Sequence, residues 1–148
     1  MPIKEITVEE AKALLDSAPS EYTYIDVRSL PEFAAGHPRG AKSVPIFHVN
    51  AATREMEPNL DFLGVIRANF PPGAKLLIGC QMGGRSRRAA EELAAAGYSG
   101  VCNVMGGFGG ARDPSGRTIA KGWRELGYPT EQEDSEGAGY ASLRNKVK

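Results

Sequence analysis

The sequence is poor in the residues that build metal sites and disulfide frameworks. Its 148 residues contain 2 cysteines and 2 histidines, with no Cys-x-x-Cys pair, so neither a structural zinc site nor a disulfide scaffold is expected. Basic and acidic residues number 18 each and form no block of like charge. This balance argues against nucleic acid or an anionic membrane surface as a partner. We expect no metal and no cofactor.

Long apolar segments are also missing. No run approaches the roughly 20 residues that cross a bilayer, and residues 1–5 lack the basic and then hydrophobic pattern of a leader. These features predict a cytoplasmic protein with no membrane association, in which both thiols stay reduced. The length fits one domain. We expect it to cover residues 1–130, followed by a polar tail over residues 131–148 that begins with an acidic stretch.

Short apolar runs alternate with helix-like segments, which is typical of an α/β domain with a mostly parallel sheet. Thr7 and Glu10 have the spacing of a capping box. Helices are expected over residues 8–17, 30–35, 59–70 and 86–96. Strands are expected over residues 22–27 and 75–78 and from Val101 onward, with a brief extended segment at residues 43–45.

Cys80 is the most informative residue of the chain. It follows the apolar run 75–78 and precedes Gly83 and Gly84, which lead into a helix. Backbone N–H groups of a tight turn and of a helix N-terminus converge on such a position, and the helix dipole adds positive charge. Arg85 adds a full charge. A small buried hydrophobic cysteine is the alternative, but Arg85 and the following helix favour a nucleophilic thiolate.

Residues 80–86, Cys-Gln-Met-Gly-Gly-Arg-Ser, resemble the active-site loop of the single-domain rhodaneses, the thiosulfate sulfurtransferases. Two further segments agree. Residues 24–28 match the family's strand that ends in Asp-x-Arg, and residues 31–45 match its Glu-Phe-x-x-Gly-His-x-x-Gly-Ala-x-x-x-Pro signature. The resemblance extends over about residues 6–129. It implies a three-layer rhodanese-like α/β fold with a mostly parallel five-stranded sheet flanked by helices.

The resemblance also implies a two-step sulfur transfer. Cys80 would take the outer sulfur of thiosulfate or a similar small donor as a persulfide, and a thiophilic acceptor would then remove it. Cyanide, a small thiol, or a protein thiol such as thioredoxin is the expected acceptor. Arg85 would bind the donor, stabilise the persulfide or turn outward to brace the loop. The backbone N–H groups that surround the sulfur would come from Gln81, Met82, Gly83, Gly84, Arg85 and Ser86.

The sequence leaves other activities open. The related dual-specificity phosphatases have one residue more between the catalytic Cys and Arg, and the four residues between Cys80 and Arg85 enclose a smaller volume, suited to one sulfur atom. Mercaptopyruvate sulfurtransferases have Gly-Val-Thr where this loop has Gly-Arg-Ser, so thiosulfate is the favoured donor. A different class of alternative is a persulfide carrier or a partner-binding rhodanese module in a sulfur pathway.

Asp26 and Arg28 are expected to support the site rather than to react. Residues at the end of a strand commonly form charge pairs that brace the neighbouring loops. Cys102 falls inside a predicted strand and is expected to be a buried apolar residue. A resolving cysteine that pairs with Cys80 is the alternative.

Residues 108–120 interrupt the family pattern as an insertion. Because they follow the carboxyl end of a predicted strand, they should lie near the active site. Their charged residues Arg112, Asp113 and Arg117 would either line the entrance and select an anionic donor or belong to a solvated loop.

Overall fold

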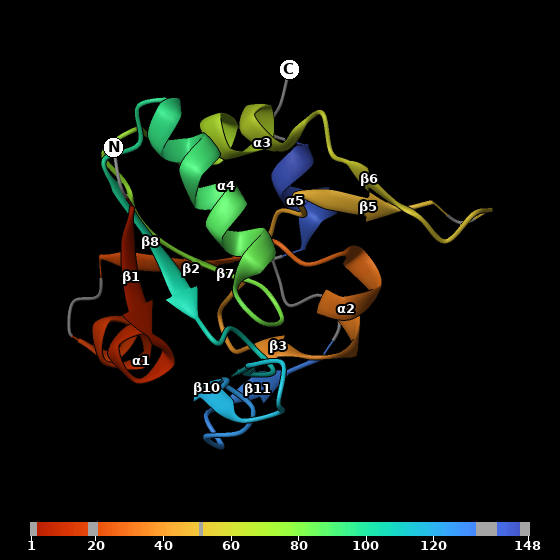
Figure 1. Ribbon diagram of the computed structural model, residues 1–148. Coiled ribbons are helices and arrows are strands. Elements are labelled where there is room, and N and C mark those ends of the chain that lie inside the picture. Colours follow the sequence, from red (N-terminus) through yellow and green to blue (C-terminus); the bar gives the residue numbers. More distant parts are fainter. Residues whose placement is uncertain (1–2, 18–20, 51, 133–138, 146–148) are drawn as a thin grey trace.

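The computed structural model describes residues 3–17, 21–50, 52–132 and 139–145 (Figure 1). Its centre is a five-stranded sheet in the order β1-β8-β7-β2-β4. All neighbouring strands in this sheet are parallel, which confirms the predicted α/β class. The strands are β1 (Lys4–Thr7), β2 (Tyr22–Asp26), β4 (Lys42–Ser43), β7 (Lys75–Gly79) and β8 (Gly100–Met105).

Helices cover both faces of the sheet and give three layers (Figure 1). Successive side chains of a strand point to opposite faces. On β7, Leu76 and Ile78 therefore join the core on the side of α3, α4 and α5, whereas Leu77 joins the core on the side of α1. The helices are α1 (Val8–Asp16), α2 (Leu30–Ala35), α3 (Phe62–Asn69), α4 (Gly84–Ala95) and α5 (Tyr140–Arg144).

The remaining strands form three short antiparallel pairs outside the main sheet. β3 (His37–Pro38) pairs with β11 (Thr130–Glu131). β5 (Phe47–Val49) pairs with β6 (Met56–Pro58), and this ribbon projects from the body in Figure 1. β9 (Ala111–Arg112) pairs with β10 (Thr118–Ala120) within the insertion. Over the described ranges, no helix has the length and apolar character needed to cross a membrane.

Several boundaries differ from the prediction. The predicted helix 59–70 begins only at Phe62, because the Asn59 side chain accepts the N–H of Asp61 and closes a turn there. Helix α4 begins at Gly84, two residues earlier than predicted, so Arg85 and Ser86 lie in its first turn. The capping box of Thr7 and Glu10 is present at the start of α1.

The packed structure extends past residue 130. Glu131 belongs to β11, and α5 packs against the core through Tyr140 and Leu143. The Asn69 side chain donates a hydrogen bond to the carbonyl of Leu143 at 2.8 Å, which ties α5 to α3. Within the segment predicted as a polar tail, residues 133–138 and 146–148 lie outside the described residues.

Candidate active site

Cys80 lies at the carboxyl end of the central strand β7, in the loop that leads to α4 (Figure 1). It is 1 % exposed. Its Sγ accepts a hydrogen bond from the Gly83 N–H at 3.0 Å. The crevice beyond the carboxyl ends of parallel strands is where open α/β sheets bind their ligands and place their reactive groups.

Backbone hydrogen bonds from residues 106–109 to its carbonyl groups hold the Cys80 loop in place. The carbonyl oxygens of residues 80–82 accept hydrogen bonds from the N–H groups of Phe108, Gly109 and Gly106, respectively, at 2.8, 2.9 and 3.2 Å. In a trans peptide the following N–H points away from the carbonyl. The N–H groups of residues 81–83 therefore face away from residues 106–109. The first N–H groups of α4 have no partner within the helix either, so the loop offers several donors to an anion beside Cys80.

Two glycines make this geometry accessible. Gly83 has φ 126°, a conformation that L side chains rarely adopt, and this turns the chain into α4. At Gly107, with φ 51°, an added Cβ would collide with the carbonyl oxygen of Cys80. The absence of a side chain at Gly107 lets the segment after β8 approach the loop closely.

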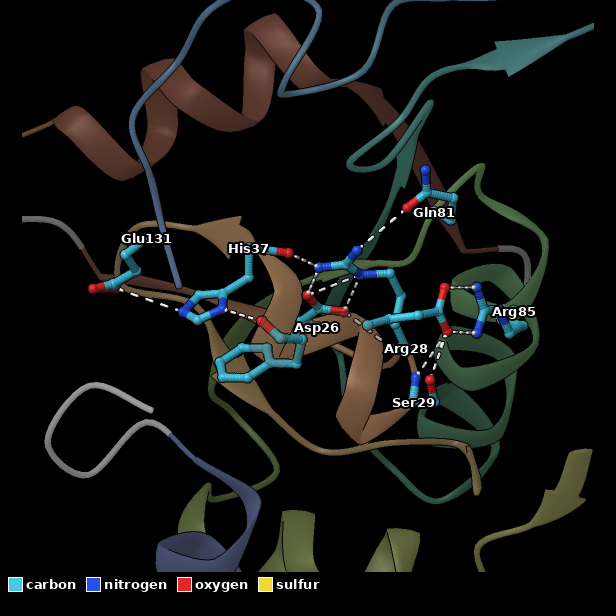
Figure 2. Close-up of polar contacts among 10 residues, drawn as sticks. Asp26, Arg28, Ser29, His37, Gln81, Arg85 and Glu131 are labelled. Carbon is cyan, nitrogen blue, oxygen red and sulfur yellow. Dashed lines mark hydrogen bonds and ion pairs between the residues drawn. The ribbon is translucent and has the colours of Figure 1, made fainter. Parts of the chain in front are cut away.

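Arg85 turns toward α2, where it forms a two-point ion pair with Glu32 at 2.7 and 3.0 Å (Figure 2). Partial burial raises the pKa of Glu32, but hydrogen bonds from Arg85 and Ser29 outweigh this effect and lower the pKa to about 2. Of the three roles considered for Arg85, this conformation corresponds to the one that braces the loop.

Asp26 and Arg28 form the charge pair that the sequence predicts. Arg28 Nη2 lies 2.7 Å from Asp26 Oδ2, and both residues are buried. The same guanidinium donates to the Gln81 side chain at 3.2 Å and to the Gly36 carbonyl at 2.6 Å (Figure 2). A buried ion pair of this kind fixes geometry more than it adds stability. Here it connects β2 to the first residue after Cys80.

A second buried network, to which no sequence motif pointed, supports the other end of the loop. The Ser86 hydroxyl donates a hydrogen bond to the Asn103 side-chain oxygen at 2.5 Å, and its oxygen lies 3.1 Å from the Gly83 carbonyl oxygen. The Asn103 amide donates in turn to Glu5 on β1 at 2.7 Å. An asparagine inside the apolar strand β8 was the available signal, because buried polar side chains are almost always hydrogen-bonded.

A cavity of about 280 Å³ opens beside the loop. Two of its lining residues connect to the loop ends, since Gln81 directly follows Cys80 and Glu32 holds Arg85. Its walls include Arg28, Glu32, Gly36, Gln81, Phe108 and Arg124.

The charged residues of the insertion do not line this cavity. Arg112 pairs with Glu125, and the Asp113 carboxylate accepts the N–H groups of Ser115 and Arg117 within the turn between β9 and β10. The insertion contacts the site instead through Phe108 and Gly109 at its start. Arg124, which lies after the insertion, also lines the cavity, and no sequence motif pointed to it.

Cys102 is only partly buried, contrary to the prediction. It packs with the core on the α1 side of the sheet, whereas Cys80 belongs to the core on the α4 side. Burial raises the pKa of Cys102, which disfavours its thiolate. This placement argues against a resolving cysteine. The described ranges contain no cluster of three or more His, Cys, Asp or Glu side chains able to hold a metal ion.

A buried cysteine at the strand-to-helix loop of a parallel sheet, with a backbone N–H on its sulfur, is the setting in which α/β domains place reactive thiols. The Rhodanese-like domain model matches residues 7–112, and the chain belongs to this family.

Named relatives agree with this assignment. The chain is 39% identical over 106 residues to thiosulfate sulfurtransferase 18 of Arabidopsis thaliana, covering 72% of this chain and 76% of the relative. It is 31% identical over 111 residues to thiosulfate sulfurtransferase GlpE of Haemophilus influenzae, covering 74% and 89%. The crystal structure of Rv0390 from M. tuberculosis matches with a TM-score of 0.69 at 28% identity, covering 90% of this chain and 100% of that chain.

Proposed function

We propose that this protein is a sulfurtransferase that carries sulfane sulfur on Cys80, with thiosulfate as the donor. In the first step the Cys80 thiolate forms a bond to the outer sulfur of thiosulfate, and the sulfur–sulfur bond of thiosulfate breaks. Its electron pair leaves with sulfite, and Cys80 keeps the persulfide. In the second step a thiophilic acceptor such as cyanide or a thiol attacks the terminal sulfur, and the Cys80 thiolate leaves.

The observation that carries the proposal is the position of the Cys80 sulfur inside its loop. Its Sγ accepts the Gly83 N–H, and the carbonyls of residues 80–82 are bonded outward. A persulfide is an anion one sulfur atom longer than the thiolate. Preorganised N–H donors of the loop and of the α4 N-terminus stabilise such an anion without rearranging during the reaction.

The surroundings of the loop support the same function. Arg28 holds Gln81, Glu32 holds Arg85, and Asn103 holds Ser86. The loop is thus fixed near its start and at its end by residues from α2, from β8 and from the turn between β2 and α2. Reactive groups supported in this way keep the geometry that catalysis needs.

A persulfide carrier shares this intermediate and differs in the acceptor that removes the sulfur fastest. Rates of persulfide discharge to cyanide, to a small thiol and to reduced thioredoxin separate the two roles. Fast discharge to the small acceptors supports the enzyme, whereas discharge confined to a protein thiol supports the carrier.

The proposal is tested by intact mass spectrometry of the reduced protein after treatment with thiosulfate and then with cyanide. We expect a gain of one sulfur atom that cyanide removes. Cys80→Ser should show no gain, and Cys102→Ser, the matched control on the other cysteine, should behave like the unmodified protein. A folded, reduced protein that gains no sulfur, or a Cys80→Ser variant that still gains it, would overturn the proposal.

A further inference from the structure

Arg124 carries the one unbalanced charge in the cavity beside the Cys80 loop, as far as the described residues define it. Arg28 is neutralised by Asp26, and Glu32 is neutralised by Arg85. For the Arg124 guanidinium, the described residues supply a contact with the Phe108 ring, at 5.2 Å from the ring centroid, and no carboxylate. The cavity therefore has a net positive charge.

Phe108 fixes Arg124 relative to the reactive loop. The Arg124 N–H donates to the Phe108 carbonyl at 3.0 Å, and the Phe108 N–H donates to the Cys80 carbonyl at 2.8 Å. The Phe108 ring also contacts the Arg28 guanidinium, at 4.5 Å from the centroid. Arginine above an aromatic ring is held by the ring's negative face. The Arg124 backbone is thus linked through Phe108 to the Cys80 carbonyl, and the Arg124 guanidinium lies against the Phe108 ring at the cavity wall.

The two arginines that contact Phe108 differ in exposure and in the number of N–H donors that remain free to bind a ligand. Arg28 is 3 % exposed and its donors already bind Asp26, Gln81 and Gly36. Arg124 is exposed and keeps its planar fork of N–H donors, the geometry that suits oxyanions. A volume of about 280 Å³ has room for a small oxyanion with part of its hydration, since one water occupies about 30 Å³ of liquid.

We propose that Arg124 binds the sulfonate end of the sulfur donor and makes the protein selective for anionic donors. This inference rests on the proposed sulfur transfer through Cys80 and assigns a substrate-binding residue to it. The donor's sulfonate lies at Arg124 in the cavity while its outer sulfur faces Cys80. Sulfite, which keeps the same oxygens, leaves through the same cavity.

Steady-state kinetics with thiosulfate and cyanide test the assignment in Arg124→Gln, Arg124→Lys and Arg124→Glu. Loss of a charge-assisted hydrogen bond should raise the KM for thiosulfate about tenfold in Arg124→Gln, with a larger rise in Arg124→Glu and a partial return in Arg124→Lys. The kcat and the KM for cyanide should stay within about twofold, because the sulfonate leaves as sulfite in the first step, before cyanide reacts with the persulfide. Arg117→Gln, an exposed arginine away from the cavity, is the matched control and should change neither KM.

A binding measurement separates this inference from the proposed function. Calorimetric titration of Cys80→Ser with thiosulfate, with and without Arg124→Gln, should show about tenfold weaker binding in the double variant. Equal binding by the two proteins, or an unchanged KM for thiosulfate in Arg124→Gln, would overturn the role of Arg124. Weaker binding in the double variant, together with no persulfide on the thiosulfate-treated protein that keeps Cys80, would retain the anion site and refute the sulfur transfer.

Discussion

The Arg85–Glu32 ion pair shows how a charge can belong to the active-site loop without facing the reacting sulfur. Arg85 lies in the first turn of α4, where its guanidinium is engaged by a carboxylate of α2. The pair is partly exposed, so its contribution to stability is modest. Its position at the end of the loop makes it a brace that depends on the ionisation of one glutamate.

Glu32→Gln tests this brace through pH. The pKa of Glu32 is about 2 in the folded protein and ~4.3 in an unfolded chain, so its stabilisation is complete above the unfolded value and is lost as the pH falls toward 2. We expect the variant to unfold about 0.5–1 kcal/mol more easily at pH 7, with the difference shrinking between pH ~4 and pH ~2. Urea unfolding at pH 7 and at pH ~2.5 measures it.

Glu55→Gln is the control, because Glu55 is exposed on the β5–β6 ribbon. This variant should leave the free energy of unfolding unchanged at both pH values. A Glu32→Gln effect of the same size at both pH values would contradict the brace.

Single residues were predictable where their signal is local. Cys80, Arg85 and the Asp26–Arg28 pair stand within short motifs, so the sequence identifies them. The partner of Arg85 is 53 residues away, and Asn103 and Arg124 reach the site only through the arrangement of strands in space. No spacing along the chain encodes such contacts, which is why Arg124 was missed and only the insertion's charged residues were considered for the entrance.

At the scale of elements, the junction between β7 and α4 determines where the sulfur lies. The strand is central and paired on both sides, whereas the helix begins only after the chain reverses at Gly83. The sequence predicted α4 to begin later, since glycine is a poor helix former. The positive φ falls on Gly83 alone, so Gly84 is free to adopt the helical conformation.

Gly83→Ala and Gly84→Ala form a matched pair that tests this junction. At Gly83 the added Cβ forces a residue with side chain into φ 126°, and we expect the free energy of unfolding to fall by about 1–2 kcal/mol and persulfide formation to slow. At Gly84 a Cβ meets nothing within 4 Å, so stability should stay within about 0.5 kcal/mol.

Urea unfolding measures the change in stability, and mass spectrometry of quenched reactions measures the rate of persulfide formation. Equal behaviour of the two variants would show that the turn does not depend on Gly83.

Elements were predictable in proportion to their apolar content. β2 and β7 carry continuous buried runs and β8 buries half of its residues, so these strands were expected, whereas β1 buries only Ile6 and was missed. The antiparallel pairs outside the main sheet have strands of two or three residues. Such short strands carry no periodicity of their own and form because the larger elements bring their backbones together.

For the whole molecule, α5 closes one side of the core. Tyr140 and Leu143 pack with α3 and the sheet, and the Tyr140 hydroxyl accepts a hydrogen bond from Asn59 at 3.2 Å. Composition near residue 131 suggested a tail because the polar residues there mask the short apolar pattern that follows. Packing of that pattern against α3 is a tertiary effect that composition does not report.

Leu143→Ala and Leu60→Ala measure what this closure contributes. Leu143 is 4 % exposed and Leu60 is 94 % exposed, so the same truncation removes buried contacts in one case and almost none in the other. We expect Leu143→Ala to lower the free energy of unfolding by about 2–4 kcal/mol and Leu60→Ala to change it by less than about 0.5 kcal/mol. Chemical denaturation gives both values, and a Leu143→Ala effect as small as that of Leu60→Ala would show that α5 is not part of the core.

The pairing of β1 with β8 has a consequence for how the chain is made. Glu5 and its partner Asn103 lie 98 residues apart, so the first strand leaves the ribosome long before the strand beside which it belongs. At ~5–20 residues per second, the wait lasts roughly 5–20 s. The support beneath Ser86 cannot be complete until that strand arrives, and a nascent chain released or stalled before residue 103 carries Cys80 without the Asn103 link.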